Sequence, residues 1–405
     1  MVTFDSYAKG PAMKTRHKDP PIGPAAPLAG AAALAAAAQT LSAAEKKKEP
    51  KADKKAAAKG PPANLPKDLA DLLEKIPAKD FEDAMPVVKA LVDKGPAAVT
   101  QLVEAVGQQF GDPEGVKPKY ALHGMVHYAS RPGADAERKM LAAALAGQLA
   151  AKHSTELKAF LCRQLQFCGR SAEVPALAAL LADAQLCEPA TQALCAIGGP
   201  QAADALRAAL PKVQGKQRMT LIGALGRFCD AAVAAEVRKS AAAEDADLRL
   251  VTWYALGNMG DAAAADLLLK AAAADAPYER SQAADACLRL ARRLGELGKA
   301  ADAEKVLRQL LEQRKAPTDV HDRCAALEAL SRVLGVKAVA DVLAALASDD
   351  LRYRHPAAVI AVDLARAIQK EHPAEAEKVL KKVLDATKEE VVRQQAELLL
   401  GKYGK

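Results

Sequence analysis

Residues 245–275 read DADLRLVTWYALGNMGDAAAADLLLKAAAAD, and this stretch decides the fold. It contains an arginine, a run of small and apolar residues, a Gly-Asp break and a second run of alanine and leucine. The arrangement returns along the chain, with arginines 31 residues apart at Arg218, Arg249 and Arg280 and again at Arg323 and Arg354. A period of about 30 residues with this content is typical of stacked helical repeats, in which one unit cannot bury its apolar face alone.

Each of these arginines opens a run in which small or apolar residues recur three, four, six and seven positions later, as on one face of a helix. Turn glycines follow at 198, 260, 298 and 335. Two helices of roughly 12 to 15 residues and two turns fit this period. Arg393 begins the last unit. We therefore expect an all-α, right-handed α-α superhelix of about nine to ten helical pairs over residues 65–405.

The unit at 245–275 also resembles a known repeat. Its matching residues are Leu248-Arg249, Ala255-Leu256-Gly257, Gly260-Asp261 and Leu267 to Leu269. They resemble the HEAT-like repeat, including the short form of phycobilisome-lyase-type HEAT proteins, although Thr252 and Trp253 replace its paired alanines. The resemblance implies a HEAT/ARM-like α-solenoid and is strongest between residues 185 and 350. It implies no single activity, because this repeat serves many functions.

Composition and charge narrow the function further. Only 3% of the residues are aromatic, so the core must form from closely packed helices with thin side chains. The net charge is +7, but residues 1–61 hold eleven Lys or Arg against five Asp or Glu, and the remainder is nearly neutral. A nucleic-acid binder would place a basic stripe on its folded surface, so we expect no nucleic-acid partner.

The N-terminal residues differ from the repeat array. From Met13 they run from basic residues into an Ala/Leu stretch and then small residues, the three-part form of a signal peptide cleaved after Ala43 or Ala44. Segment 1–44 is thus interpreted as a signal peptide or, alternatively, a disordered tail, and either Met1 or Met13 could start the chain. Segment 45–64, rich in Lys, Ala and Pro, is interpreted as a solvated linker. No stretch is apolar enough to predict a transmembrane helix.

The recurring arginines themselves are expected to be structural. Arginine can bind two acceptors at once. Acidic residues lie one or two positions before three of the recurring arginines, namely Asp247, Glu279 and Asp322. In HEAT-like proteins the equivalent arginine commonly pairs with an acidic or backbone group of a neighbouring unit. We assign this role to Arg218, Arg249, Arg280, Arg323, Arg354 and Arg393.

Candidate binding residues come five and nine positions after each arginine, because the helices that carry them line the concave side of related solenoids. The residues expected to face this groove are Arg227, Tyr254, Asn258, Asp285, Arg289, Glu328 and Arg332, with Gly223, Val359 and Asp363 completing the row. Arg227, Arg289 and Arg332 could form a cationic seam. The i,i+4 pairs Asp285–Arg289 and Glu328–Arg332 would instead neutralise themselves and leave a solvated charged face.

Catalytic and metal motifs are absent from the sequence. There is no Walker loop, dinucleotide fingerprint, G-x-S-x-G, H-E-x-x-H or C-x-x-C, so we predict no catalytic residues, cofactor or metal site. His123 and His127 share a helical face at i,i+4 but have no identifiable third ligand. The seven cysteines are expected to be small core residues.

These observations favour a non-enzymatic scaffold or adaptor that binds a protein or peptide on its concave face, and we expect a monomer. The alternative is a bilin lyase or isomerase-like HEAT protein acting on a tetrapyrrole, although an enzyme is not the favoured class. The composition and tail resemble exported bacterial HEAT-repeat proteins, which implies a periplasmic or secreted location. A cytoplasmic location is the alternative.

Overall fold

The computed structural model describes residues 65–76, 81–108, 110 and 116–401. The interpretations of segments 1–44 and 45–64 lie outside these residues. Within the described part of the chain the regular elements are all helices, and no strand is found. None of these helices is long and apolar enough to cross a membrane.

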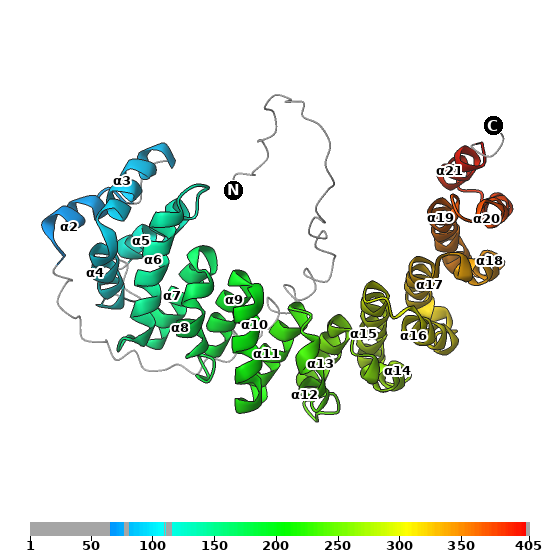
Figure 1. Cartoon of the computed structure of the whole chain (residues 1–405), viewed down its shortest axis with the longest axis horizontal. Coiled ribbons are helices and arrows are strands. Elements are labelled where there is room, and N and C mark those ends of the chain that lie inside the picture. Colours follow the sequence, from blue (N-terminus) through cyan, green and yellow to red (C-terminus); the bar gives the residue numbers. More distant parts are fainter. Residues whose placement is uncertain (1–64, 77–80, 109, 111–115, 402–405) are drawn as a thin grey trace. The chain divides into compact units, whose positions relative to one another are not determined.

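The helices form two layers. The recurring arginines Arg218, Arg249, Arg280, Arg323, Arg354 and Arg393, which we call the register arginines, all lie in the first layer. We call this layer the arginine layer. Each helix of this layer packs against the next one along the layer (Figure 1). Its members are α3 (Phe81–Asp93), α5 (Val116–Ala129), α7 (Thr155–Cys168), α9 (Cys187–Ile197), α11 (Gly215–Arg227), α13 (Ala246–Met259), α15 (Pro277–Glu296), α17 (Val320–Leu334), α19 (Leu351–Ile368) and α21 (Glu390–Leu400).

The second layer alternates with the first along the chain. It consists of α4 (Gly95–Gln108), α6 (Asp135–Gly147), α8 (Val174–Ala178), α10 (Gly199–Ala209), α12 (Ala234–Arg238), α14 (Ala265–Ala272), α16 (Ala300–Gln313), α18 (Val339–Leu346) and α20 (Pro373–Ala386). The short helix α2 (Lys67–Leu73) precedes the first pair and packs on α3 and α5. The described residues thus form nine pairs and a final helix, and the expected α-solenoid is confirmed.

The unit quoted first shows how the sequence encodes these elements. The side chain of Asp245 caps α13 by accepting from the backbone N–H groups of Asp247 and Leu248, a contact typically worth about 1 kcal/mol. The helix ends at Gly260, whose φ of 69° lies in the left-handed region that glycine adopts without strain. A short 3-10 turn at Ala262–Ala264 then leads into α14.

Two arginine intervals are longer than 31 residues, and helix length explains them. Between Arg280 and Arg323 lie most of α15, with 20 residues, and α16, with 14. Between Arg354 and Arg393 lie most of α19, with 18 residues, and α20, with 14. In the shorter units α12 has five residues and α14 has eight. The longer units therefore extend both helices within the same two-layer architecture.

Glycine allows the closest approach between helices of the arginine layer. A Cβ at Gly226 of α11 would lie 2.7 Å from the Cα of Ala255 in α13. A Cβ at Gly257 of α13 would lie 2.7 Å from the carbonyl oxygen of Ala286 in α15. Both distances are shorter than real contacts, so these two interfaces depend on glycine. Alanines such as Ala255 and Ala286 complete a core with few large side chains.

Four register arginines bind the chain that precedes their own helix. Arg218 donates to the carbonyl of Leu210 at 3.2 Å, and Arg249 donates to that of Ala243 at 2.5 Å. Arg354 donates to the carbonyl of Ser348 at 3.2 Å, and Arg393 to that of Thr387 at 3.2 Å. Each bond fixes a turn against the start of the following helix, because a charged donor binds a carbonyl more strongly than a neutral one.

The acidic partners differ from unit to unit. Glu279 of α15 pairs with Arg249 of α13 at 2.6 Å and so links two neighbouring units. Arg280 pairs with Asp319 at 3.2 Å, and not with one of the acidic residues that lie just before a recurring arginine. Arg323 lies over the ring of Tyr353 in the next unit, 3.9 Å from its centroid. Contacts between units are therefore made by ion pairs at some interfaces and by aromatic stacking at another.

A buried charge cluster joins α15, α16 and α17. The side chain of Arg314 is 2% exposed and lies 3.6 Å from Asp319, itself 6% exposed, and 3.4 Å from Asp322. Arg314 also donates to the carbonyl of Arg280 at 2.7 Å. Burial raises the pKa of the Asp322 carboxyl. Because removing one member strands buried charge, this cluster should fix the junction firmly.

Candidate functional site

Among the residues that the structure describes, none of those five and nine positions after each arginine is buried. Tyr254 and Asn258 are half-buried, whereas Arg227 is exposed. Asp285 pairs with Arg289 at 2.7 Å, and Glu328 pairs with Arg332 at 2.8 Å. The arginines of the expected seam are thus partly neutralised by residues of their own helices.

One contact in this row runs between units. The guanidinium of Arg289 in α15 lies over the ring of Tyr254 in α13, 5.0 Å from its centroid. Trp253, the neighbour of Tyr254, is instead buried, and its indole N–H donates to the carbonyl of Ala241 at 3.0 Å. Tyr254 and Arg289 therefore form a continuous surface across the central units.

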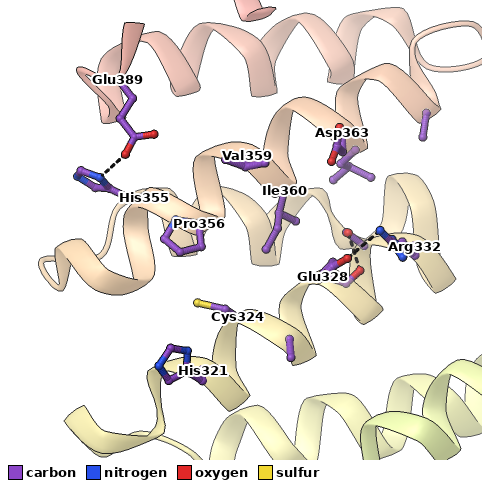
Figure 2. Close-up of a pocket in the computed structure, with 14 residues that line it drawn as sticks. His321, Cys324, Glu328, Arg332, His355, Pro356, Val359, Ile360, Asp363 and Glu389 are labelled. Atoms are coloured by element: carbon purple, nitrogen blue, oxygen red, sulfur yellow. Dashed lines mark hydrogen bonds and ion pairs between the residues drawn. The ribbon is translucent and has the colours of Figure 1, made fainter. Parts of the chain in front are cut away.

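Between α17 and α19 the same surface opens into a groove of 880 Å³ (Figure 2). Its lining includes the predicted positions Glu328, Arg332, Val359 and Asp363. The other lining residues are His321, Cys324, Ala325, Ser331, His355, Pro356, Ile360, Leu364, Ala367 and Glu389. The groove therefore combines the predicted rows of two successive units with neighbouring residues of the same helices and with Glu389, which precedes α21.

The groove has an apolar floor and a charged rim. Val359, which is 45% exposed, lies beside Pro356 and Ile360 along α19. The rim holds the Glu328–Arg332 pair and a contact of 2.9 Å between His355 Nδ1 and the carboxylate of Glu389 (Figure 2). Apolar groups framed by a few polar ones are typical of binding sites.

The backbone of α19 explains one unusual contact in the groove. Pro356 lies inside this helix and has no N–H to donate to the carbonyl of Arg352, four residues earlier. The thiol of Cys324 in α17 lies 4.0 Å from that carbonyl oxygen and is positioned as a weak donor. Burial raises the pKa of the Cys324 thiol, so it remains protonated and is not an activated nucleophile.

Sequence reasoning missed His321, Cys324, His355, Pro356 and Ile360. Cys324 and His355 each directly follow a register arginine, one helical turn before positions already selected. Both would have been found by also selecting the residue four positions before each predicted position that lies five residues after the arginine. Ile360 has no such signal, because its position after Arg354 is normally occupied by a core residue.

Four of the seven cysteines fit the expectation of small core residues, whereas Cys195, Cys229 and Cys324 are half-buried and Cys324 lines the groove. Cys162, Cys168, Cys187 and Cys287 are buried. Burial raises the pKa of Cys162, Cys168 and Cys287 to about 12. These thiols are therefore protonated near neutral pH. In the part of the chain that the structure describes, no three His, Cys, Asp or Glu side chains are grouped so that they could hold a metal ion.

A second cluster lies on the arginine layer between α5 and α7. The Nε2 atoms of His123 and His127 are 3.0 Å apart, and His123 Nδ1 lies 3.1 Å from Oε1 of Gln164. The ring of Phe167 lies 5.1 Å from that of His127 and 6.0 Å from that of His123. Burial and the neighbouring His123 lower the pKa of His127, so this imidazole is neutral at pH 7.

Comparisons with known proteins find similarity to this chain among solved structures. No protein-family model and no curated protein matches it. Among solved structures, human deoxyhypusine hydroxylase is 16% identical with a TM-score of 0.30, over 68% of this chain and 99% of that one. Importin beta is 14% identical with a TM-score of 0.40, over 82% of this chain and 55% of that one.

A third similar chain comes from a structure of the cadherin and beta-catenin interaction, with 13% identity and a TM-score of 0.36. It matches over 82% of this chain and 85% of that one. Identities and TM-scores this low carry no inference about what this chain binds. The description of the fold therefore rests on the contacts between its own helices.

Proposed function

We propose that this chain is a non-enzymatic protein-binding scaffold that holds a peptide segment of a partner protein in the groove between α17 and α19. The observation that carries the proposal is the groove itself, which places the predicted positions of two units around one exposed apolar floor. A solenoid offers such a surface on rigid helices, so little ordering of the scaffold is needed when a segment binds.

The charges of the groove indicate the chemistry of the segment. Three carboxylates, of Glu328, Asp363 and Glu389, and one guanidinium, of Arg332, line it. Carboxylates therefore outnumber guanidinium groups in the lining. We expect a segment with a large apolar side chain for the floor and Lys or Arg on either side of it.

The central part of the row would extend this interface. Tyr254 with Arg289, and the exposed Arg227, continue the same layer toward the N-terminal units. A longer partner would contact these residues after its apolar anchor is seated. Asn258 and Asp285 would supply polar contacts at the edge of such an interface.

The tetrapyrrole alternative has no such support. The groove lining contains one arginine and no Phe, Tyr or Trp. A tetrapyrrole pocket is expected to combine aromatic and cationic side chains, so we do not carry this function forward.

The proposal is tested with a Val359→Asp variant, which places a charge on the apolar floor. Partners are captured from the source cells with wild-type and variant chains and identified by mass spectrometry. The matched control is Leu398→Asp, because Leu398 of α21 is 68% exposed and does not line the groove. A partner retained by the control and lost with Val359→Asp supports the proposal. If both variants retain every partner, the groove is not the binding site.

We also propose that the chain is exported and acts as a monomer. Support for export comes from the three-part pattern within residues 1–44. Mass spectrometry of the protein from cell fractions should find an N-terminus after Ala43 or Ala44 outside the cytoplasm. An uncut cytoplasmic protein would remove the export proposal, and light scattering that gives twice the chain mass would remove the monomer proposal.

A further inference from the structure

We propose that His123 and His127 form a two-histidine site for a divalent transition-metal ion, Cu²⁺ or Ni²⁺, on the surface of α5. This site is separate from the groove between α17 and α19, and it does not depend on the proposed scaffold function. Imidazole nitrogens are preferred ligands of these ions, and two of them on successive turns of one helix can chelate a single ion.

The separation of the two nitrogens fits two ligands of one ion. The Nε2 atoms of His123 and His127 are 3.0 Å apart. Ligand nitrogens about 2.05 Å from a metal lie about 2.9 Å apart at adjacent corners of a square and about 3.3 Å apart in a tetrahedron. The observed spacing is thus close to that of two nitrogens bound to one ion.

The arrangement of the rings supports chelation as well. The ring centroids of His123 and His127 are 4.3 Å apart. Two imidazoles pointing at one another along a single line would hold their centroids farther apart, because each centroid lies a ring radius behind its nitrogen. The two Nε2 atoms are thus presented side by side, as two ligands of one ion require.

A buried amide orients the first ligand. Gln164 of α7 is 4% exposed, and its Oε1 atom accepts from His123 Nδ1 at 3.1 Å. With its proton on Nδ1, His123 has a lone pair on Nε2, which accepts from His127 Nε2 at 3.0 Å and becomes available to an ion when His127 carries its proton on Nδ1 instead. Metal-binding histidines commonly donate their second ring nitrogen in this way, and the bond fixes both tautomer and ring orientation.

The ring of Phe167, on the neighbouring helix α7, is also held in place. Phe167 packs near both imidazoles, and its carbonyl accepts from Arg138 at 2.5 Å and from Ser130 at 3.3 Å. These bonds anchor the end of α7 to α5 and α6. His127 itself is exposed, so water or a donor atom from another molecule can complete the coordination of the ion.

The site is tested by titrating the untagged full-length chain with Cu²⁺ or Ni²⁺ in a non-chelating buffer, followed by calorimetry and by electron spin-echo spectroscopy of bound Cu²⁺. We expect one site with two imidazole nitrogens. His127→Ala should weaken binding at least about tenfold, and Gln164→Leu about tenfold through the lost orienting bond. Zn²⁺ should bind more weakly than Cu²⁺.

The control is the double variant His321→Ala and His355→Ala, which removes two histidines from the groove between α17 and α19 and should leave the affinity for the ion unchanged. Circular dichroism confirms that each variant is folded, and His127→Ala is the safest because its side chain is exposed. The proposal is overturned if His127→Ala binds Cu²⁺ as tightly as wild type, or if the spectra show a single imidazole.

Discussion

The central units and the C-terminal units share one arginine register but present different surfaces. Eight residues after the arginine, α11 and α13 carry Gly226 and Gly257, which touch the backbone of the next helix. The equivalent positions of α17 and α19 hold Ser331 and Val362. The surface between α17 and α19 contains the groove of 880 Å³.

The residue eight positions after the arginine therefore influences whether neighbouring helices are in backbone contact or leave a gap between them. Without a side chain, two helices approach until backbone meets backbone. A larger residue keeps the helices apart, and side chains of the exposed row then border the gap. Glycine thus brings α11, α13 and α15 into backbone contact, whereas the row of residues five and nine positions after the arginine lines a groove between α17 and α19.

The largest expected effect concerns the junction between the two regions. Arg314→Ala would leave the Asp322 carboxylate without its ion-pair partner and Asp319 with Arg280 alone, and should reduce the free energy of unfolding by about 3 kcal/mol. Urea unfolding followed by circular dichroism measures the loss. Arg332→Ala is the control, since its ion pair is exposed and should contribute less than about 1 kcal/mol. Equal losses for both variants would show that the buried cluster does not hold the junction.

Adding one methyl group to a closed interface should have the next largest effect. Gly257→Ala should destabilise the chain by about 1 to 3 kcal/mol, because the new Cβ overlaps the carbonyl of Ala286. Ser331→Ala at the same register position should change stability by less than about 1 kcal/mol. Chemical denaturation compares the two. Alanine normally favours a helix over glycine, so a more stable Gly257→Ala variant would contradict close packing at this interface.

The register arginines should also differ between the regions. Arg218 donates to Ser240 at 2.9 Å and pairs with Glu236 at 3.0 Å, whereas Arg323 stacks on Tyr353. Arg218→Met should cost about 2 kcal/mol, because buried acceptors lose a charged donor. Arg323→Met retains an apolar contact with the ring and should cost about 1 kcal/mol or less. Thermal unfolding of both variants tests this order, and a larger loss for Arg323→Met would reverse it.

The smallest effect is a gain in stability. Cys229 has a φ of 53°, and it stands 11 residues after Arg218, where Gly260 stands after Arg249. Cys229→Gly should stabilise the chain by about 1 kcal/mol by relieving left-handed backbone strain. Gly260→Ala should be destabilising, since its Cβ would lie 2.8 Å from Arg293 Cγ. Differential scanning calorimetry should show opposite shifts, and a destabilised Cys229→Gly variant would be inconsistent with strain.

The sequence allowed the fold to be predicted because its small residues repeat at helical spacing behind an arginine. It also indicated positions of each unit that are not buried, such as Tyr254 and Glu328. The groove could not be predicted, because its depth depends on the separation of α17 and α19. That separation follows from contacts between helices, and the opening at Cys324 and Pro356 depends on a backbone carbonyl that no spacing rule reveals.

The histidine cluster illustrates the same limit. The i,i+4 spacing of His123 and His127 was visible in the sequence, but Gln164 lies 41 residues from His123 along the chain. Only the packing of α7 on α5 places the amide and the ring of Phe167 beside the imidazoles. The pattern alone therefore predicted no metal site, whereas the geometry supports one.

The most direct test of the central claim is site-specific photo-crosslinking from position 359 in the source cells. We expect a discrete crosslink to one protein, lost when Glu328→Lys and Asp363→Lys reverse the charge of the groove. The same crosslinker at Asp302, exposed on α16 in the second layer, should not capture that protein. Equal crosslinking from both positions, or a crosslink that survives the charge reversal, would contradict a binding groove between α17 and α19.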